Sequence, residues 1–325
     1  MTRLASLLMI ACLSAAIGAD EPATAPQTPS PSAGQRLPAW RVEDAAVRSG
    51  NQAIKLMERQ LTESSGVAFS RRKPNRIWSH NDSGGRARLF CFDHRGQATG
   101  SVTLAGVRAV DWEAMDCFQV NGRPYLMAAD VGDNDRRRGG VTLYVFSEPD
   151  PDRHQHVNAI LQINLTYQGG ATNCEAVAVD VSGKQILLLS KSPLLSSLHR
   201  IELPATEQIE RHIQQPGLHQ LAMESKWLAA VPLPLVTGMD ICPKTGDIWA
   251  CNYLHAIRFA KLPEKSVAVQ IQQSPEMISL PQLKQVEAIA IDQQGRAWVT
   301  SEGSPTPLRR VVRQKPRPQR IDTTP

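Results

Sequence analysis

The segment Glu287-Ala-Ile-Ala-Ile-Asp292 is followed, after a turn containing Gly295, by Arg296-Ala-Trp-Val-Thr-Ser-Glu302. Two short apolar runs joined by a glycine turn predict an antiparallel hairpin, because Gly readily adopts the positive φ of a tight turn. Four earlier segments repeat this arrangement: an acidic or small residue opens one apolar run, and a second run ends in polar residues. The five copies begin at residues 65, 113, 175, 237 and 287.

The spacing of the copies predicts the fold class. The steps between them are 48, 62, 62 and 50 residues, close to the repeats of about 40–50 residues that build one four-stranded blade of a β-propeller. We therefore expect an all-β propeller of about five blades, with a sixth, degenerate blade left open. An α/β fold is disfavoured because only residues 207–215 have a weakly helical pattern.

The last copy is incomplete, because the chain becomes basic and proline-rich soon after Val312. Residues 53–61, which precede the first copy, are predicted to supply its missing strand. Pairing the two ends of the repeat region in one sheet closes the ring and protects its edges.

The chain ends are predicted to lie outside the propeller. Residues 1–19 have the basic start, apolar centre and small final residues of a secretory signal peptide, with cleavage after Ala19. A proline-rich linker is expected at 20–39, the propeller at 40–313 and a disordered basic tail at 314–325. The protein is thus expected to be secreted or periplasmic, and lipid attachment at Cys12 is the alternative.

Charge and hydropathy narrow the class of partner. The formal net charge is +5, and residues 305–325 alone account for it, with six basic residues against Asp322. A neutral body with one basic end does not resemble a nucleic-acid-binding domain. No segment after the signal peptide is long and apolar enough to span a bilayer, and we expect a monomer with an unknown extracellular ligand or protein partner.

An odd number of cysteines remains after cleavage. Export permits disulfides, but at least one thiol must then stay free within the chain. No CxxC pair is present, which disfavours a structural zinc site. The pairing is left open among Cys91, Cys117, Cys174, Cys242 and Cys251.

Three glutamates occupy the same position in three copies. Glu113, Glu175 and Glu287 each come just before an apolar run predicted to be an inner strand. In a propeller such positions converge on one mouth of the central channel. Because clustered carboxylates repel one another unless a cation neutralises them, and because Ca²⁺ prefers oxygen ligands, the pattern suggests a calcium site.

Further oxygen donors are expected near the same mouth, where the second strands end. Besides Asp82 and Asn173, the candidate metal ligands are Asp130, Asp133, Asn134 and Asn252. A purely structural role is the alternative, since Asp and Asn at strand ends commonly bond turn amides, and each repeated Glu is able to bond the neighbouring blade's backbone.

Few residues suggest catalysis. His80 and Asp82 lie together at the end of a predicted strand and, with Glu113, are the candidate acid–base residues. The alternative for His80 is packing within a turn. The chain has no GxSxG elbow, P-loop, GxGxxG or HExxH motif.

These motifs resemble those of a family of secreted bacterial β-propeller proteins of unassigned function. The matching segments, between about Gly66 and Val312, are Trp78-Ser79-His80-Asn81-Asp82-Ser83-Gly84, Asp111-Trp112-Glu113, Ala129-Asp130-Val131-Gly132-Asp133-Asn134, Asn173-Cys174-Glu175-Ala176 and Thr300-Ser301-Glu302-Gly303. Here Asn173 replaces an acid, which removes one charge from any metal site, and Ala129 replaces Gly. At fold level the family is similar to calcium-binding propeller phytases and gluconolactonase-type propellers, an analogy that does not establish function.

Two functions remain. The first is a binding or scaffold propeller with a calcium ion at the channel mouth. The second is a metal-dependent hydrolase of a phosphate ester, lactone or other ester, in which the cation polarises the substrate and activates water. The hydrolase requires carboxylates that converge on an open site, whereas the binding function fits glutamates bonded to backbone or a closed cation site. Lys191 and Arg86 are the basic residues expected near the mouth.

Overall fold

The computed structural model describes residues 53–312. The predicted signal peptide (1–19), the alternative lipid site at Cys12, the linker (20–39) and the basic tail (314–325) lie outside the described residues. So do residues 40–52 and 313, at the two ends of the predicted propeller domain.

The described strands form four sheets, and neighbouring strands that are consecutive in the chain pair antiparallel. One sheet contains β2 (Ser64–Phe69), β3 (Arg76–Asn81), β4 (Arg86–Asp93), β5 (Ala98–Arg108) and β9 (His154–Val157). A second contains β15 (Gly238–Ile241), β16 (Ile248–Cys251), β17 (His255–Phe259) and β18 (Glu276–Ser279). A third contains β19 (Val286–Ile291), β20 (Ala297–Ser301), β21 (Thr306–Arg310) and β1 (Ala53–Leu56).

The remaining sheet has eight strands. Its first half is β6 (Trp112–Val120), β7 (Arg123–Asp130), β8 (Val141–Ser147) and β10 (Ala159–Tyr167). Its second half is β14 (Gly217–Val231), β13 (Ser196–Glu202), β12 (Gln185–Ser190) and β11 (Cys174–Asp180). The halves meet where β10 and β14 pair in parallel, from Ala159 opposite Gly217 to Tyr167 opposite Ser225.

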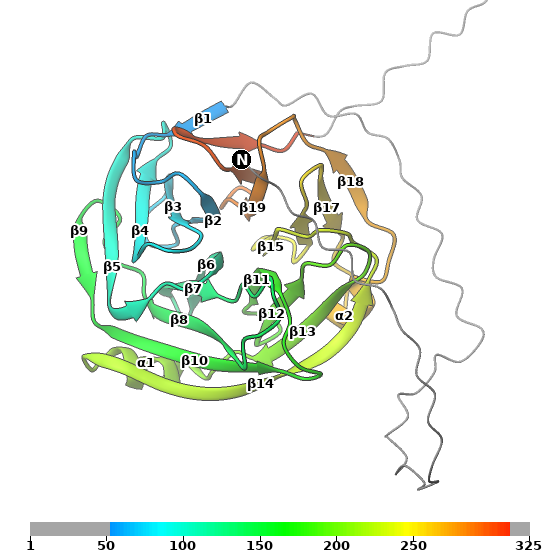
Figure 1. The fold of residues 1–325 in the computed structure, drawn as a ribbon, viewed down its shortest axis with the longest axis horizontal. Coiled ribbons are helices and arrows are strands. Elements are labelled where there is room, and N and C mark those ends of the chain that lie inside the picture. The colour runs from blue at the N-terminus through cyan, green and yellow to red at the C-terminus, as the bar shows by residue number, and fades with distance from the viewer. Residues whose placement is uncertain (1–52, 313–325) are drawn as a thin grey trace, which may run out of the picture. The chain divides into compact units, whose positions relative to one another are not determined.

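The first strands of the repeats form the centre of the fold. β19 packs against β2, β2 against β6, β6 against β11, β11 against β15, and β15 against β19, so the contacts close a cycle. Figure 1 shows these strands around the middle of the ring, with the later strands of each sheet farther out. This arrangement is a β-propeller, and it confirms the all-β prediction.

The predicted pairing of the chain ends is also confirmed. β1 lies antiparallel to β21, with Ala53 opposite Arg309 and Leu56 opposite Thr306. Leu56 is fully buried, so the segment contributes apolar packing as well as backbone hydrogen bonds. A strand that precedes the first copy therefore completes the last sheet.

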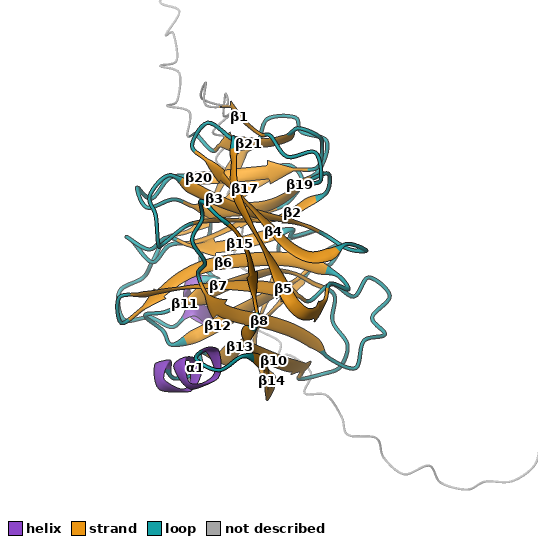
Figure 2. Ribbon diagram, turned by 90° about the vertical axis from the view of Figure 1, so that its left-hand side faces the viewer, coloured by secondary structure: helices purple, strands orange, loops and turns teal. Residues whose placement is uncertain are grey.

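The two longest repeat steps contain elements that the repeat pattern does not predict. β9 lies within the step that begins at residue 113 and pairs in parallel with β5. The helix α1 (Thr206–Ile213), close to the weakly helical segment, and the 15-residue β14 lie within the next step. Figure 2 shows α1 beside the sheet, and it contacts β10. The short helix α2 (Val267–Gln270) precedes β18.

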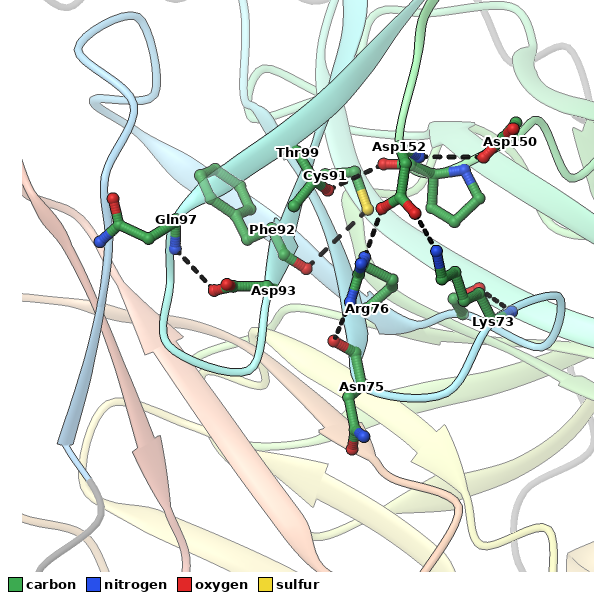
Figure 3. Close-up of polar contacts among 12 residues, drawn as sticks. Lys73, Asn75, Arg76, Cys91, Phe92, Asp93, Gln97, Thr99, Asp150 and Asp152 are labelled. Atoms are coloured by element: carbon green, nitrogen blue, oxygen red, sulfur yellow. Dashed lines mark hydrogen bonds and ion pairs between the residues drawn. The ribbon is translucent and has the colours of Figure 1, made fainter.

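The segment before β9 is held to the first sheet by charged side chains. Asp152 forms ion pairs with Lys73 from the β2–β3 connection and with Arg76, the first residue of β3, as Figure 3 shows. The two cations lower the pKa of Asp152 below its usual value. Nearby, Asp93 accepts hydrogen bonds from the backbone N–H groups of Arg95 and Gln97, which fixes the β4–β5 turn.

The cysteines of the described chain are buried, free thiols. Burial raises the pKa of Cys91, Cys174 and Cys251 to about 12. Thiols with such values stay protonated at neutral pH, so they pack as small apolar groups rather than act as nucleophiles. The set comprises Cys91, Cys117, Cys174, Cys242 and Cys251.

Candidate metal centre at the channel mouth

The three repeated glutamates lie at the same end of the ring. Glu113 is the second residue of β6, Glu175 of β11 and Glu287 of β19. Each is almost completely buried, with 7%, 2% and 8% of its surface exposed. A register shift interrupts each inner strand's pairing at this residue, so the pleat is irregular where the glutamate projects. We call this end of the channel the mouth.

One glutamate belongs to a tight cluster of carboxylates. Oxygen atoms of Asp82, Asp111 and Glu113 all lie within 4.8 Å of one another. Asp82 directly follows β3, and Asp111 directly precedes β6. The backbone N–H of Trp112 donates to the carbonyl of Asp82 (3.2 Å), and Ser83 forms a β-bridge with Asp111. These backbone contacts bring two neighbouring sheets together and set the positions of the three side chains.

Mutual repulsion and burial favour the protonated forms of the cluster. Burial, a hydrogen bond from Asp111 and the nearby negative charges raise the pKa of Asp82 to about 7. Burial raises the pKa of Glu113 well above its usual value, and the charges of Glu175, Asp82 and Asp111 raise it further. The pKa of Asp111 is raised by burial as well. Ionising such a cluster without a cation costs free energy.

The cluster has features that fit a cation site built from oxygen donors. One carboxylate oxygen of Asp82, Oδ1, is buried without a hydrogen-bond partner. Gly132 packs against the other two members: a Cβ atom there would lie 2.4 Å from Asp111 Oδ2 and 2.9 Å from Glu113 Cγ. An unpartnered acceptor beside two more carboxylates, with glycine making room for them, fits a hard cation such as Ca²⁺.

Glu175 lies close enough to act on the cluster, but it has its own partners. Lys191 Nζ forms an ion pair with its Oε2 at 2.6 Å, and Asn173 Nδ2 donates to its Oε1 at 3.1 Å. The ammonium of Lys191 also lies 5.3 Å from the centre of the Tyr253 ring. The ion pair raises the pKa of Lys191 above its usual value, so a positive charge persists at the mouth.

Glu287 projects from β19, which packs against β2 and β15. Its Oε1 accepts a hydrogen bond from Gln285 Nε2. Burial raises its pKa to about 7, although the hydrogen bond from Gln285 and the charge of Lys191 partly oppose this shift. The structure therefore brings Glu113 and Glu175 near one another, and Glu287 close enough that the charge of Glu175 raises its pKa.

The other candidate ligands bond mainly to the chain's own donors. Asp130 accepts from the N–H groups of Val110 and Asp111 and forms an ion pair with Arg138 at 2.8 Å. Asp133 accepts from the N–H groups of Arg137 and Arg138, both at 2.9 Å. These two carboxylates fix the loops that position Asp111 and Gly132.

The two asparagine candidates also hold local structure. Asn252 Oδ1 accepts from the N–H groups of Leu254 and His255, and its Nδ2 donates to the carbonyl of Pro234. Asn134 Oδ1 accepts from Asn173 Nδ2 at 3.0 Å. Asn134 therefore links the loop after β7 to the residue before β11.

His80 is fully buried and packs edge-on against Trp112, with ring centres 5.3 Å apart. Its ring nitrogens lie 2.9 Å from the carbonyl of Asn81 and 3.2 Å from that of Ala114. Burial lowers its pKa. These contacts hold the ring of His80, a residue of β3, between two sheets.

Asp111 was not among the ligands predicted from the sequence. The signal was present in Asp111-Trp112-Glu113, because a residue two positions before a strand's mouth-facing Glu also lies at that mouth. Tyr253, which packs on Lys191, follows candidate Asn252 directly and was not singled out either.

No protein-family model and no curated protein matches this sequence. Among solved structures, a gluconolactonase from Xanthomonas campestris aligns with a TM-score of 0.41 and 12% identity, covering 80% of this chain and 89% of that one. A Bacteroides thetaiotaomicron VPI-5482 protein of unknown function aligns at 0.41 and 11%, covering 81% and 72%. A chain of a nidogen/laminin complex aligns at 0.43 and 10%, covering 76% and 74%.

No helix within residues 53–312 is both long and apolar enough to cross a membrane.

Proposed function

We propose that this protein is a five-bladed propeller that binds Ca²⁺ at its mouth and uses the same face to bind a partner or ligand outside the cytoplasm. The eight-stranded sheet counts as two blades joined at their outer strands. The leader at residues 1–19 directs export in this proposal. The observation that carries it is the convergence of Asp82, Asp111 and Glu113 within 4.8 Å.

The donor set favours calcium over softer metals. All three side chains offer oxygen, and each of their pKa values is raised. A divalent cation would replace the protons and relieve the repulsion between the carboxylates. Because Ca²⁺ takes six to eight oxygen ligands, three carboxylates leave coordination positions for water or for oxygens of a ligand.

Exposed apolar side chains around the mouth support a binding role. Among residues 53–312, eight large apolar side chains are exposed, and five of them belong to loops at the mouth end. Contiguous exposed apolar surface commonly marks an interaction site. The five, with their exposed fractions, are Val110 (47%), Leu194 (82%), Leu195 (49%), Leu235 (39%) and Leu254 (67%).

Three of the loops that carry these side chains are connected to one another. The N–H of Leu235 donates to the carbonyl of Ser192 at 2.8 Å, and Asn252 Nδ2 donates to the carbonyl of Pro234 at 3.3 Å. Lys191 and Tyr253 lie in the same loops. An apolar patch thus adjoins the charged mouth.

A calcium titration tests the proposal. Saturating Ca²⁺ is expected to raise the melting temperature of the full chain relative to chelator, because a ligand that binds only the folded state stabilises it. Asp111→Asn and Glu113→Gln should abolish the shift, and Glu224→Gln, an exposed acid on β14, should retain it. An unchanged melting temperature together with no heat of Ca²⁺ binding by calorimetry would refute the calcium site.

A specific observation favours the hydrolase as the second candidate function. Within the described chain, Glu113, Glu175 and Glu287 accept no backbone hydrogen bond. Glu175 and Glu287 bond to side chains instead, which leaves Glu113 available to a cation or a substrate. With a cation bound, its free positions would polarise a substrate oxygen and activate water, and Lys191 would attract an anionic group.

The hydrolase is tested by a panel of phosphate esters, carboxylic esters and lactones, with Ca²⁺ and with chelator. Turnover that requires Ca²⁺ and falls at least about a hundredfold in Glu113→Gln is the result that supports it. Calcium binding without turnover of any of the three substrate classes would exclude the hydrolase and leave only the binding function.

A further inference from the structure

A cavity lies at the end of the channel opposite the mouth. It measures about 820 Å³ and is lined by the second half of β6 and by the ends of β11 and β15 with the connections that follow them. Its volume is within the range of small-molecule sites, which is roughly 300–1,000 Å³. We call it the rear cavity. None of the mouth carboxylates lines it.

Six charged side chains of the rear cavity lack ion-pair partners among residues 53–312. All six line the cavity: the acids Asp116, Asp180 and Asp240, and the bases Arg71, Lys244 and Lys261. Uncompensated charges of both signs around one cavity indicate a ligand that carries both signs.

The two carboxylates are held rigidly by backbone. Asp116 Oδ2 accepts from the N–H of Val179 at 2.7 Å, and Asp240 Oδ2 accepts from the N–H of Ile291 at 2.6 Å. Each aspartate thus reaches from its own inner strand to the next one. A binding group fixed in this way loses little conformational entropy when a ligand arrives.

No cation of the chain fully compensates these carboxylates. Burial raises the pKa of Asp116 to about 6 and, with the charge of Asp116 nearby, that of Asp240 to about 8. The charge of Arg71 lowers both, but not enough to reverse the shift. An ammonium group placed between them would supply the missing positive charge.

The positive charges of the same cavity are more exposed than Asp116. Asp116 is only 7% exposed, whereas Lys244 is exposed and Lys261 is half-buried. Arg71 is half-buried, and its Nε donates to the carbonyl of Cys117 at 2.8 Å. That bond leaves the two terminal nitrogens of the guanidinium, which suit a carboxylate.

We propose that the rear cavity binds a small zwitterion, a free amino acid or short peptide, with its ammonium between Asp116 and Asp240 and its carboxylate at Arg71 and the lysines. Asp116 is buried and Lys244 is exposed, which sets this orientation. The site is independent of the calcium site at the mouth.

Three related probes test the charge pattern by calorimetry on the full chain in chelator: glycylglycine carries both charges, N-acetylglycine only the carboxylate, and glycinamide only the ammonium. Glycylglycine is expected to bind at least about tenfold more tightly than either analogue. Its binding at pH 7.5 should release protons, seen as a heat that depends on the buffer, because the ammonium displaces the proton of Asp240.

Substitutions locate the site. Asp240→Asn keeps an acceptor for the N–H of Ile291 and should weaken glycylglycine about tenfold or more, as should Arg71→Gln. Glu224→Gln, far from the cavity on β14, should bind as the parent does. A melting curve of each variant shows whether it is folded.

Several results would overturn the proposal. N-acetylglycine that binds as tightly as glycylglycine would show an anion site, and equally tight glycinamide would show a cation site. Absence of glycylglycine binding up to about 10 mM would leave Asp116 and Asp240 as links between strands. If a variant that loses binding proves to be unfolded, glycylglycine binding is measured in Asp116→Asn in its place.

Discussion

The two ends of the channel both gather carboxylates, but they hold them differently. At the rear, Asp116 and Asp240 are each anchored by the N–H of the next inner strand. At the mouth, Asp82, Asp111 and Glu113 face one another, and one oxygen has no partner. An anchored carboxylate stabilises the packing of neighbouring inner strands whether or not a ligand is present. A group of unanchored carboxylates repels itself until a cation arrives.

The largest effect that sharpens this comparison is the response to pH. In chelator, the free energy of unfolding should fall as pH rises from about 5 to 8, by about 1–3 kcal/mol after solvent screening. Asp82 and Glu287 have pKa values of about 7, and Asp240 of about 8. These values exceed the unfolded ones near 4, so the folded state holds more protons in this window and loses stability as they leave.

Urea unfolding at several pH values measures this response. Saturating Ca²⁺ should flatten the part that comes from the mouth, and Asp240→Asn should remove the part above pH 7 at the rear. Stability that rises over the same range in chelator would contradict the raised pKa values at both ends.

Pairs of substitutions separate anchored from unanchored carboxylates. At residue 116, the Asn variant keeps an acceptor for Val179 N–H and the Ala variant does not. The Ala variant should therefore be less stable by about 1–3 kcal/mol, the cost of an unsatisfied buried donor. At residue 111, Asn and Ala should differ by less than about 0.5 kcal/mol in chelator. Equal gaps at both residues, measured by urea unfolding, would remove the distinction.

Gly132→Ala is expected to affect the mouth alone. The added methyl group would lie 2.4 Å from Asp111 Oδ2, so the carboxylate must move away from its neighbours. Calcium affinity should fall about tenfold or more, while glycylglycine binding at the rear stays unchanged. Gly139→Ala is the matched control, since a Cβ there meets nothing within 4 Å. Unaltered calcium affinity in Gly132→Ala would show that the cluster is not the ligand set.

The smallest effect on stability is expected at the exposed leucines. Leu194→Asn and Leu254→Asn should change the free energy of unfolding by less than about 0.5 kcal/mol, because these side chains are 82% and 67% exposed. A larger loss in urea unfolding would mean that the apolar patch stabilises the fold instead of contacting a partner. Val269→Asn, exposed on α2, is the matched control.

The inner strands and the ring closure were predictable because they rest on local patterns. An apolar run opened by Glu113 or Glu287 has the same neighbours wherever it occurs, and residues 53–56 match a visible gap in the last copy. The parallel pairing of β10 with β14 was not predictable, since it joins outer strands about 60 residues apart and depends on the path of the insert that contains α1.

The site was predictable only in part, for a similar reason. Repeat alignment placed the glutamates at one mouth, but Asp111 precedes the repeat unit and became visible only through its contacts. At the rear, Asp116 and Asp240 occupy a position where the other copies have Ala68, Ala178 and Ala290. That contrast is present in the sequence, but it points to a ligand site only together with the cavity that Asp116 and Asp240 line.

The pairing of β1 with β21 has a consequence for how the chain is made. The strand translated first in the described region belongs to the sheet translated last, some 250 residues later. During synthesis, residues 53–56 must remain without their partner until 306–310 have emerged, and a chain that stops early exposes the unpaired side of β20. Completion of the ring is therefore a late, long-range event, which is expected to be slow compared with the formation of each hairpin.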